Sequence, residues 1–219
     1  MRFLIGCEVS GRVRDALRAR GHDAWSCDLK PNNTGPHYQC DLREVLDLGW
    51  DALIAFPDCT YVCSSGLHWN HRVPGRAQKT DEAVEFFRFL LNYQAIPKRG
   101  LENPIGCLST RVRKPDQIIQ PWWFGDDASK STCLWLEGLP KLVRDPNKAF
   151  PPRYVCMDCK SVSRGTCGEC SSCGSLRVKE RWGNQTDSGQ NKLGPSDDRA
   201  EVRSMTYQGI ANQMAEQWG

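Results

Sequence analysis

The sequence lacks any apolar stretch long enough to span a bilayer, so no membrane-spanning helix is expected. No secretory signal is visible either, because Glu8 interrupts the first apolar run too early for a signal-peptide core. A strong excess of either charge is also lacking, because 29 Lys and Arg residues are nearly balanced by 26 Asp and Glu residues. The formal net charge of +3 permits contact with nucleic acid without arguing for it. Internal repeats and low-complexity tracts are also missing. These absences favour a cytoplasmic, globular protein.

The composition is globular, with 39% hydrophobic and 25% charged residues. A chain of 219 residues favours one domain with a small appendage and can bury a core without disulfide bonds. Of the twelve cysteines, seven are scattered singly through residues 7–133 and five lie within residues 156–173. A reducing compartment with a metal site explains this distribution better than a secreted disulfide scaffold.

Apolar runs and helical spacings alternate along the first hundred residues. The predicted strands are 3–7, 24–28, 51–57 and 100–104, and the predicted helices are 13–20, 83–93 and, near the C-terminus, 207–218. The alternation predicts an α/β fold with a Rossmann-like, doubly wound sheet of parallel strands.

Polar residues follow directly after these apolar runs. They are Glu8, Ser10, Asp28, Asp58, Cys59, Glu102 and Asn103. Because the carboxyl ends of parallel strands meet at one edge of a sheet, we expect these side chains to line one crevice.

A glycine turn from Gly6 to Gly11 links the first predicted strand to a helix, a layout that lets the backbone approach a nucleotide cofactor closely. Asp28 suits a ribose diol and Asp41 suits an adenine amino group, because carboxylates accept hydrogen bonds. The same pattern is equally compatible with a plain turn and a helix cap.

Two further motifs carry side chains suited to catalysis. Cys59, in the turn from Phe56 to Thr60, offers a thiolate nucleophile, and Cys63 is a weaker competitor. Glu102, before Asn103 and Pro104, offers a carboxylic acid for hydrogen bonding to a heterocycle. Taken singly, the first motif is also typical of a small buried cysteine and the second of a strand-end turn.

The order of these motifs is more informative than any one of them. A glycine turn, the acids at 28 and 41, Pro-x-Cys, Glu-Asn-Pro and Arg-Val-Arg follow one another. This order resembles the DNA cytosine carbon-5 methyltransferase family, and the chain is most similar to short, phage-borne proteins of that type. The similarity includes the segments 7–14, 117–121, 131–136 and 209–218, and it covers most of the chain outside residues 153–178.

The resemblance implies transfer of a methyl group from S-adenosylmethionine to carbon 5 of a cytosine flipped out of DNA. Cys59 would attack carbon 6 of the pyrimidine, and Glu102 would polarise the base. The other implied catalytic residues are Asn103 and the phosphate- or substrate-contacting Arg111 and Arg113. The implied cofactor-binding residues are Cys7, Glu8, Ser10, Gly11, Asp28, Asp41 and Pro57.

The chain departs from the family in two places. Asp58 stands between Pro57 and Cys59, and a neighbouring carboxylate is expected to raise the pKa of the thiol. The chain is also too short for a large target-recognition domain, so a free pyrimidine nucleotide stays an alternative substrate. A non-catalytic nucleic-acid-binding protein is a third interpretation. No Asp-Pro-Pro-Tyr-like motif occurs, which disfavours methylation of an exocyclic amine.

The cysteine cluster contains two C-x-x-C knuckles separated by ten residues, with the ligands Cys156, Cys159, Cys170 and Cys173. Four thiolates at this spacing predict a tetrahedral, structural Zn²⁺ site in preference to a redox or disulfide arrangement. Cys167 is a fifth thiol that would replace a ligand or stay outside the site. The flanking basic residues would either contact DNA phosphates or form a solvated surface; they are Arg153, Lys160, Arg164, Arg177, Lys179 and Arg181.

The expected organisation is therefore a methyltransferase domain over residues 1–150 and 199–219, a zinc-ribbon insertion over 151–180 and a polar loop over 181–198. DNA is the expected partner, a free pyrimidine nucleotide is the alternative, and no membrane contact is expected. The protein is expected to be a monomer or small homo-oligomer in the cytoplasm, which would be that of a bacterial host if the sequence is phage-borne. For several aromatic and histidine side chains the sequence allows two interpretations, contact with the substrate base or an ordinary core or loop position. They are Trp69, Trp122, Trp123, Trp135, His68 and His71.

Overall fold

The computed structural model describes residues 1–164, 168–196 and 199–219, and they form two compact units. The sheet unit consists of Met1–Ile119, Ser131–Val143 and Ile210–Gly219, and the ribbon unit consists of Gln120–Lys130 and Arg144–Gly209. Within the described residues, no helix has both the length and the apolar character that crossing a membrane requires.

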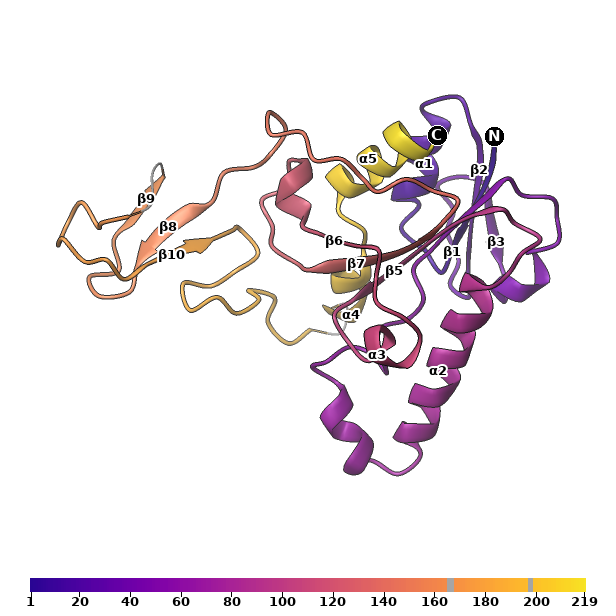
Figure 1. Cartoon of the computed structure of the whole chain (residues 1–219), viewed down its shortest axis with the longest axis horizontal. Coiled ribbons are helices and arrows are strands. Elements are labelled where there is room, and N and C mark those ends of the chain that lie inside the picture. The colour runs from indigo at the N-terminus through magenta and orange to yellow at the C-terminus, as the bar shows by residue number, and fades with distance from the viewer. Residues whose placement is uncertain (165–167, 197–198) are drawn as a thin grey trace. The chain divides into compact units, whose positions relative to one another are not determined.

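A seven-stranded sheet forms the centre of the sheet unit (Figure 1). In chain order its strands are β1 (Arg2–Gly6), β2 (Asp23–Asp28), β3 (His37–Gln39), β4 (Ala52–Ala55), β5 (Lys98–Pro104), β6 (Gln117–Ile119) and β7 (Thr132–Glu137). Their spatial order is β3-β2-β1-β4-β5-β7-β6. The predicted parallel pairing holds from β3 to β5, whereas β7 runs antiparallel to both of its neighbours. The fold is therefore mixed α/β with a mostly parallel sheet.

Helices of the sheet unit cover both faces of this sheet, which explains why its strands are apolar on both sides. The helices of this unit are α1 (Arg12–Arg18), α2 (Arg76–Leu91), α3 (Leu108–Arg111) and, from Ile210 onward, α5 (Gln208–Trp218), with short 3-10 turns η1 (Leu42–Glu44) and η2 (Leu67–His71). Leu101 packs in the core that α2 covers, whereas a Cβ atom added at the preceding Gly100 would lie 3.4 Å from the ring of Trp218 in α5. Successive residues of β5 thus face α2 and α5 in turn.

Apolar spacing predicts the buried part of a helix and misses its polar ends. Helix α2 buries Thr80, Val84, Phe87 and Leu90, at helical spacing. It begins seven residues before the predicted start at 83, because its polar first turns carry no apolar periodicity. The central strands β1 and β4 are almost completely buried, as their unbroken apolar runs predict.

The ribbon unit contains a separate three-stranded antiparallel sheet in the order β10-β8-β9. Its strands are β8 (Arg153–Cys156), β9 (Val162–Arg164) and β10 (Val178–Arg181), and the unit also has the 3-10 turn η3 (Pro121–Phe124) and α4 (Arg199–Ser204). The segment after β10 binds residues 127–129: Gly183 donates its N–H to Asp127 and Asn184 bonds to the backbone of Ser129. These bonds explain why residues 120–130, assigned to the main domain from the sequence, group with the ribbon.

Candidate functional site

The strand register brings the predicted site loops to one edge of the sheet. Gly6 at the end of β1 lies opposite Cys27 in β2 and Ala55 in β4, and Ala55 in turn lies opposite Leu101 in β5. Phe56 donates its N–H to the carbonyl of Gly6 at 2.9 Å, so the loop that leaves β4 starts beside the turn that leaves β1. The segments that begin at Cys7, Asp28, Phe56 and Glu102 therefore share the carboxyl edge.

A pocket of about 360 Å³ opens at this edge, within the size range of small-molecule sites. Four of the predicted cofactor residues line it, namely Cys7, Asp28, Asp41 and Pro57. The remaining lining residues are Cys27, Leu29, Cys40, Leu42, Arg43, Asp58, Tyr61, Ala83 and Phe86. The pocket thus combines carboxylates with aliphatic and aromatic surface.

The pocket is acidic. Asp28, Asp41 and Asp58 contribute three negative charges and Arg43 one positive charge, which leaves a formal −2. The guanidinium of Arg43 pairs with Asp41 at 2.9 Å and lies over the ring of Phe86 at 4.5 Å. A pocket of this charge favours a cationic ligand or one that donates hydrogen bonds, and it disfavours phosphates.

Cys7 is held in a sparsely populated backbone conformation at the pocket wall. Its φ is 55°, in the left-handed region that residues other than glycine rarely adopt. Burial, together with the charges of Asp28, Asp41 and Asp58, raises the pKa of its thiol to about 12. The thiol is therefore protonated at neutral pH, which suits a weak hydrogen-bond donor and not a nucleophile.

The other predicted cofactor residues of the first turn lie outside the pocket lining. Glu8 is 4% exposed, and its Oε1 accepts from the Ser10 hydroxyl at 2.5 Å and from the Val13 N–H at 3.3 Å. Burial raises the pKa of this carboxyl group above its ordinary value. Gly11 precedes α1 with a φ of 72°. Glu8, Ser10 and Gly11 thus shape the turn that presents Cys7.

Asp41 has a structural role beside its place in the pocket. Its Oδ1 accepts from the backbone N–H of Arg43 and caps η1, and Glu44 accepts in return from the Asp41 N–H. This capping box fixes the carboxylate at the pocket wall.

Asp58 is turned toward the residue after Cys59. Its Oδ1 accepts from the Thr60 N–H at 2.9 Å and from the Thr60 hydroxyl at 2.6 Å. The carbonyl of Cys59 accepts from Cys63 N–H at 3.0 Å. Asp58 therefore closes a tight turn around Cys59, and Cys59 itself is half-buried against the core.

Asn103 joins the end of β5 to the loop that carries Cys59. It is 1% exposed, and its Nδ2 donates to the carbonyl of Pro57 at 2.7 Å. The adjacent Glu102 is half-buried. In the sheet register, Glu102 lies opposite Leu134 of β7. Burial and the charge of Glu102 raise the pKa of the neighbouring Cys133 thiol to about 11.

Gly106, which none of the sequence motifs includes, allows the segment after β5 to touch the loop that carries Cys59. A Cβ atom at this position would lie 1.9 Å from the carbonyl oxygen of Val62. Cys107 donates its N–H to that same carbonyl at 2.9 Å, and Ser64 donates to Ile105 at 3.0 Å. A glycine two residues after Pro104 was the available signal, since close backbone approach requires a residue without a side chain.

The structure separates the two predicted arginines. Arg111, at the end of α3, pairs with Asp81 of α2 at 2.8 Å and is exposed. Arg113 pairs with Asp116 at 2.7 Å and with Glu137 at 3.1 Å, next to β7. The structure therefore places Arg113 in an ion-pair cluster that ties the segment before β6 to β7, and does not bring it to the pocket.

The aromatic and histidine residues that the sequence offered as possible base contacts lie in different environments. Trp135 is 1% exposed and packs edge-on against Phe87, so it belongs to the core. Trp69 and both histidines lie on η2, where Trp69 is 45% exposed. In the ribbon unit, Trp122 stacks on Trp182 with ring centroids 5.4 Å apart.

The four predicted zinc ligands converge. The sulfurs of Cys156, Cys159, Cys170 and Cys173 all lie within 4.8 Å of one another. Cys156 and Cys173 are 3.7 Å apart, and Cys159 and Cys170 are 3.6 Å apart. Tetrahedral Zn²⁺ with ligands at about 2.3 Å has sulfurs about 3.8 Å apart, whereas a disulfide bond is about 2.0 Å long. The donor set fits zinc.

The two knuckles have the same backbone geometry. In the first, Lys160 N–H donates to the Cys156 carbonyl, and in the second, Gly174 N–H donates to the Cys170 carbonyl. Both donors have left-handed φ angles, 64° for Lys160 and 73° for Gly174. This repetition turns each pair of thiols toward one point. Cys167 lies outside the described residues.

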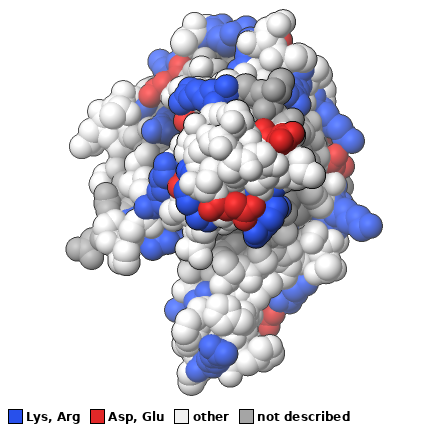
Figure 2. Space-filling view, turned by 90° about the vertical axis from the view of Figure 1, so that its left-hand side faces the viewer, with Lys and Arg blue, Asp and Glu red and all other residues white. Residues whose placement is uncertain are grey.

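The basic residues of the ribbon are partly neutralised. Arg153 pairs with Asp187 at 2.7 Å and Arg177 with Asp158. Figure 2 shows Lys and Arg side chains spread over this face with acidic side chains among them, and not gathered into one continuous patch.

Comparison with known proteins supports the fold. The sequence matches no protein-family model and no curated protein sequence. Among solved structures, the fold is similar to that of the Entamoeba histolytica methyltransferase EhMeth, with a TM-score of 0.54 and 10% sequence identity, over 99% of this chain and 97% of that chain. The chain therefore has a mixed α/β fold with a mostly parallel sheet, like that of a methyltransferase.

Proposed function

We propose that this protein is an S-adenosylmethionine-dependent methyltransferase that acts on carbon 5 of cytosine in DNA. The observation that carries the proposal is an acidic pocket at the carboxyl edge of a methyltransferase-like sheet, next to the loops of Cys59 and Glu102. The motif order, which resembles the DNA cytosine carbon-5 methyltransferase family, supplies the substrate.

The pocket suits a cationic nucleoside. S-adenosylmethionine carries a sulfonium, an ammonium and a carboxylate group, and its net charge of about +1 is stabilised by a pocket of formal charge −2. All four of Asp28, Asp41, Leu29 and Phe86 line the pocket. In the proposal, Asp28 would accept from the ribose hydroxyls and Asp41 from the adenine amino group, while Leu29 and Phe86 would offer apolar surface to the base. The same charge disfavours the pyrophosphate of a dinucleotide, which distinguishes this site from other Rossmann-like sites.

In the proposed mechanism, the Cys59 thiolate adds to carbon 6 of the flipped cytosine and forms a sulfur–carbon bond. Glu102 donates a hydrogen bond or proton to the ring nitrogen, which stabilises the negative charge that this addition creates. The bound cofactor supplies an electrophilic methyl group. Carbon 5 would then become nucleophilic and accept the methyl group, and the electron pair of the broken sulfur–methyl bond would leave with S-adenosylhomocysteine. Loss of the carbon 5 proton to solvent would return the electron pair of the carbon–hydrogen bond to the ring, which re-forms the 5,6 double bond and breaks the sulfur–carbon bond to release the Cys59 thiolate. Asn103 holds the two catalytic loops in register through Pro57.

The ribbon would hold a structural zinc ion through its four cysteines, which stabilises a segment with few buried apolar residues. Its surface is the proposed contact to DNA phosphates. Residues 153–181 contain six basic and three acidic residues. A four-thiolate zinc centre adds a formal −2, because four negative sulfurs outweigh the ion. The net charge is then +1, so a modest contribution to DNA affinity is expected from this surface.

Covalent trapping tests the proposal. The protein is incubated with S-adenosylmethionine and DNA that contains 5-fluorocytosine, whose fluorine cannot leave as a proton does. We expect an adduct on Cys59 that disappears in Cys59→Ser and persists in the matched control Cys63→Ser. An adduct with 5-fluorocytosine nucleotide but not with DNA would instead support the nucleotide-modifying alternative. Cofactor binding without any adduct would contradict carbon-5 chemistry, and no cofactor binding at all would favour a non-catalytic nucleic-acid-binding protein.

A further inference from the structure

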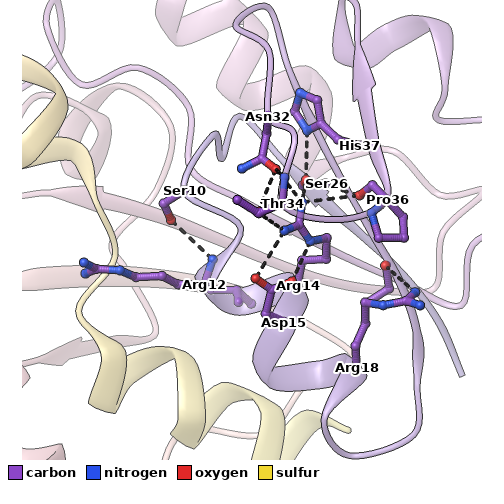
Figure 3. Close-up of polar contacts among 12 residues, drawn as sticks. Ser10, Arg12, Arg14, Asp15, Arg18, Ser26, Asn32, Thr34, Pro36 and His37 are labelled. Carbon is purple, nitrogen blue, oxygen red and sulfur yellow. Dashed lines mark hydrogen bonds and ion pairs between the residues drawn. The ribbon is translucent and has the colours of Figure 1, made fainter.

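The Arg14 side chain of α1 is completely buried and lies at the centre of a polar network (Figure 3). Its Nε and Nη2 donate to the Asp15 carboxylate at 2.8 and 3.2 Å. Its Nη1 donates to the Ser26 hydroxyl at 3.0 Å and to Asn32 Oδ1 at 3.2 Å, and Nη2 also donates to the Thr34 hydroxyl at 2.7 Å. Burying a guanidinium is costly unless it is fully partnered, so this network is specific.

Two of these partners, Asn32 and Thr34, belong to the loop of residues 29–36, which follows Asp28 directly. The start of this loop forms one wall of the acidic pocket, because Asp28 and Leu29 both line it. Leu29 is 73% exposed and has little packing of its own to hold it. Asp28 is held by the pairing of β2 with β3, whereas the position of Leu29 and the loop after it depends on polar contacts along the loop.

Asn32 connects the loop to the part of the pocket wall that Cys7 forms. Its Nδ2 donates to the carbonyl of Val9 at 2.5 Å, in the turn that carries Cys7. The backbone of that turn packs directly on the guanidinium, since a Cβ atom at Gly11 would lie 2.4 Å from Nη2 of Arg14. A chain of contacts from Arg14 through Asn32 to Val9 thus joins the Cys7 wall to the Asp28 wall.

We infer that Arg14 and Asn32 are positioning residues that hold these two walls at the spacing a nucleoside requires before it binds. The inference rests on the proposed function, which assigns the pocket to the cofactor. Neither residue is among those that line the described pocket. They act by pre-organisation: a wall that is already ordered loses less conformational entropy on binding.

The test measures binding of S-adenosylhomocysteine by calorimetry and amide exchange of residues 29–36. Asn32→Asp keeps the oxygen that accepts from Arg14 but removes the donor to Val9. We expect the dissociation constant to rise about tenfold, with faster exchange in residues 29–36 and a melting temperature close to that of the wild type. A purely structural role would lower the melting temperature without weakening binding to the folded protein.

A matched pair at an exposed position guards against misfolding. Thr34→Val removes the hydroxyl that accepts from Arg14, whereas Thr34→Ser retains it. We expect weaker binding for the valine variant and wild-type binding for the serine variant. Asn33→Asp is the control, because it makes the same chemical change as Asn32→Asp at the next, exposed position of the loop, and it should leave the dissociation constant unchanged.

The outcomes separate the two proposals. A wild-type protein that does not bind S-adenosylhomocysteine contradicts the proposed function. A wild-type protein that binds, together with unchanged affinity and exchange in both Asn32→Asp and Thr34→Val, overturns the positioning role alone.

Discussion

The side-chain amide of Asn103 donates a hydrogen bond to the main-chain carbonyl of Pro57, 46 residues earlier in the chain, at 2.7 Å. This bond connects the end of β5, which carries Glu102, to the loop after β4, which carries Cys59. A buried side chain thereby links two segments that are distant in sequence and that carry the proposed catalytic residues.

Replacing Asn103 with alanine should lower both stability and activity. The buried carbonyl of Pro57 would lose its partner, which costs about 1–3 kcal/mol of unfolding free energy. Covalent trapping of 5-fluorocytosine DNA should slow at least about tenfold, because misplaced catalytic groups lose their favourable orientation. Urea unfolding and the trapping rate measure the two effects. Asn147→Ala, at an exposed position, is the control, and equal behaviour of the two variants would contradict the role of Asn103.

Gly106→Ala should disrupt the contact between the same two loops. The added Cβ would lie 1.9 Å from the Val62 carbonyl oxygen, so backbone must move. We expect a loss of about 1–3 kcal/mol in unfolding free energy, as is usual for overpacking. Gly194→Ala makes the same chemical change where a Cβ meets nothing within 4 Å, and it should leave the melting temperature unchanged. A wild-type melting temperature for Gly106→Ala would show that the loops are not closely apposed.

The buried Glu8 should produce a measurable pH dependence of stability. Its pKa is raised by burial, so the folded state holds the proton to a higher pH than the unfolded state does. Below the unfolded pKa both states are protonated and the ionisation has no effect. As pH rises from there through the raised folded pKa, ionisation increasingly favours the unfolded state. Glu8→Gln retains an acceptor for Ser10 and Val13 and cannot ionise.

The stability of Glu8→Gln relative to the wild type should therefore increase as pH rises through that window and stay constant above it. Chemical denaturation at a series of pH values measures this difference. A difference that is independent of pH would mean that Glu8 titrates equally in both states.

Zinc removal should unfold the ribbon and spare the central sheet. Metal analysis should find a single equivalent of zinc per chain, and Cys170→Ala should lose it while Cys63→Ala keeps it. Because the structural ion supplies folding free energy, chelation should abolish amide protection in β8 and β10. Protection of β1 and β4 should persist, since their core consists of buried apolar side chains. A wild-type protein that retains protection in β8 after complete zinc removal would contradict a metal-dependent ribbon.

The sequence was sufficient where the informative residues are close together in the chain. The C-x-x-C spacing identified the four converging thiols, because two ligands of each knuckle are held by the same few backbone hydrogen bonds. Apolar runs located β1, β2 and β4, since a buried parallel strand must be apolar on both faces. Polar residues directly after those runs, such as Asp28, therefore fell at the carboxyl edge, as expected.

Only the tertiary structure decided how distant segments meet. Arg111 and Arg113 are alike in sequence, yet one pairs with α2 and the other beside β7. The antiparallel direction of β7 depends on the order of the strands in the sheet. Phe86 lines the pocket because of how α2 packs on that sheet. Arg14 reads as an ordinary surface residue of an amphipathic helix, and it is buried because a loop folds over it. Burial and pairing between distant segments are set by the whole core, and local sequence patterns do not contain them.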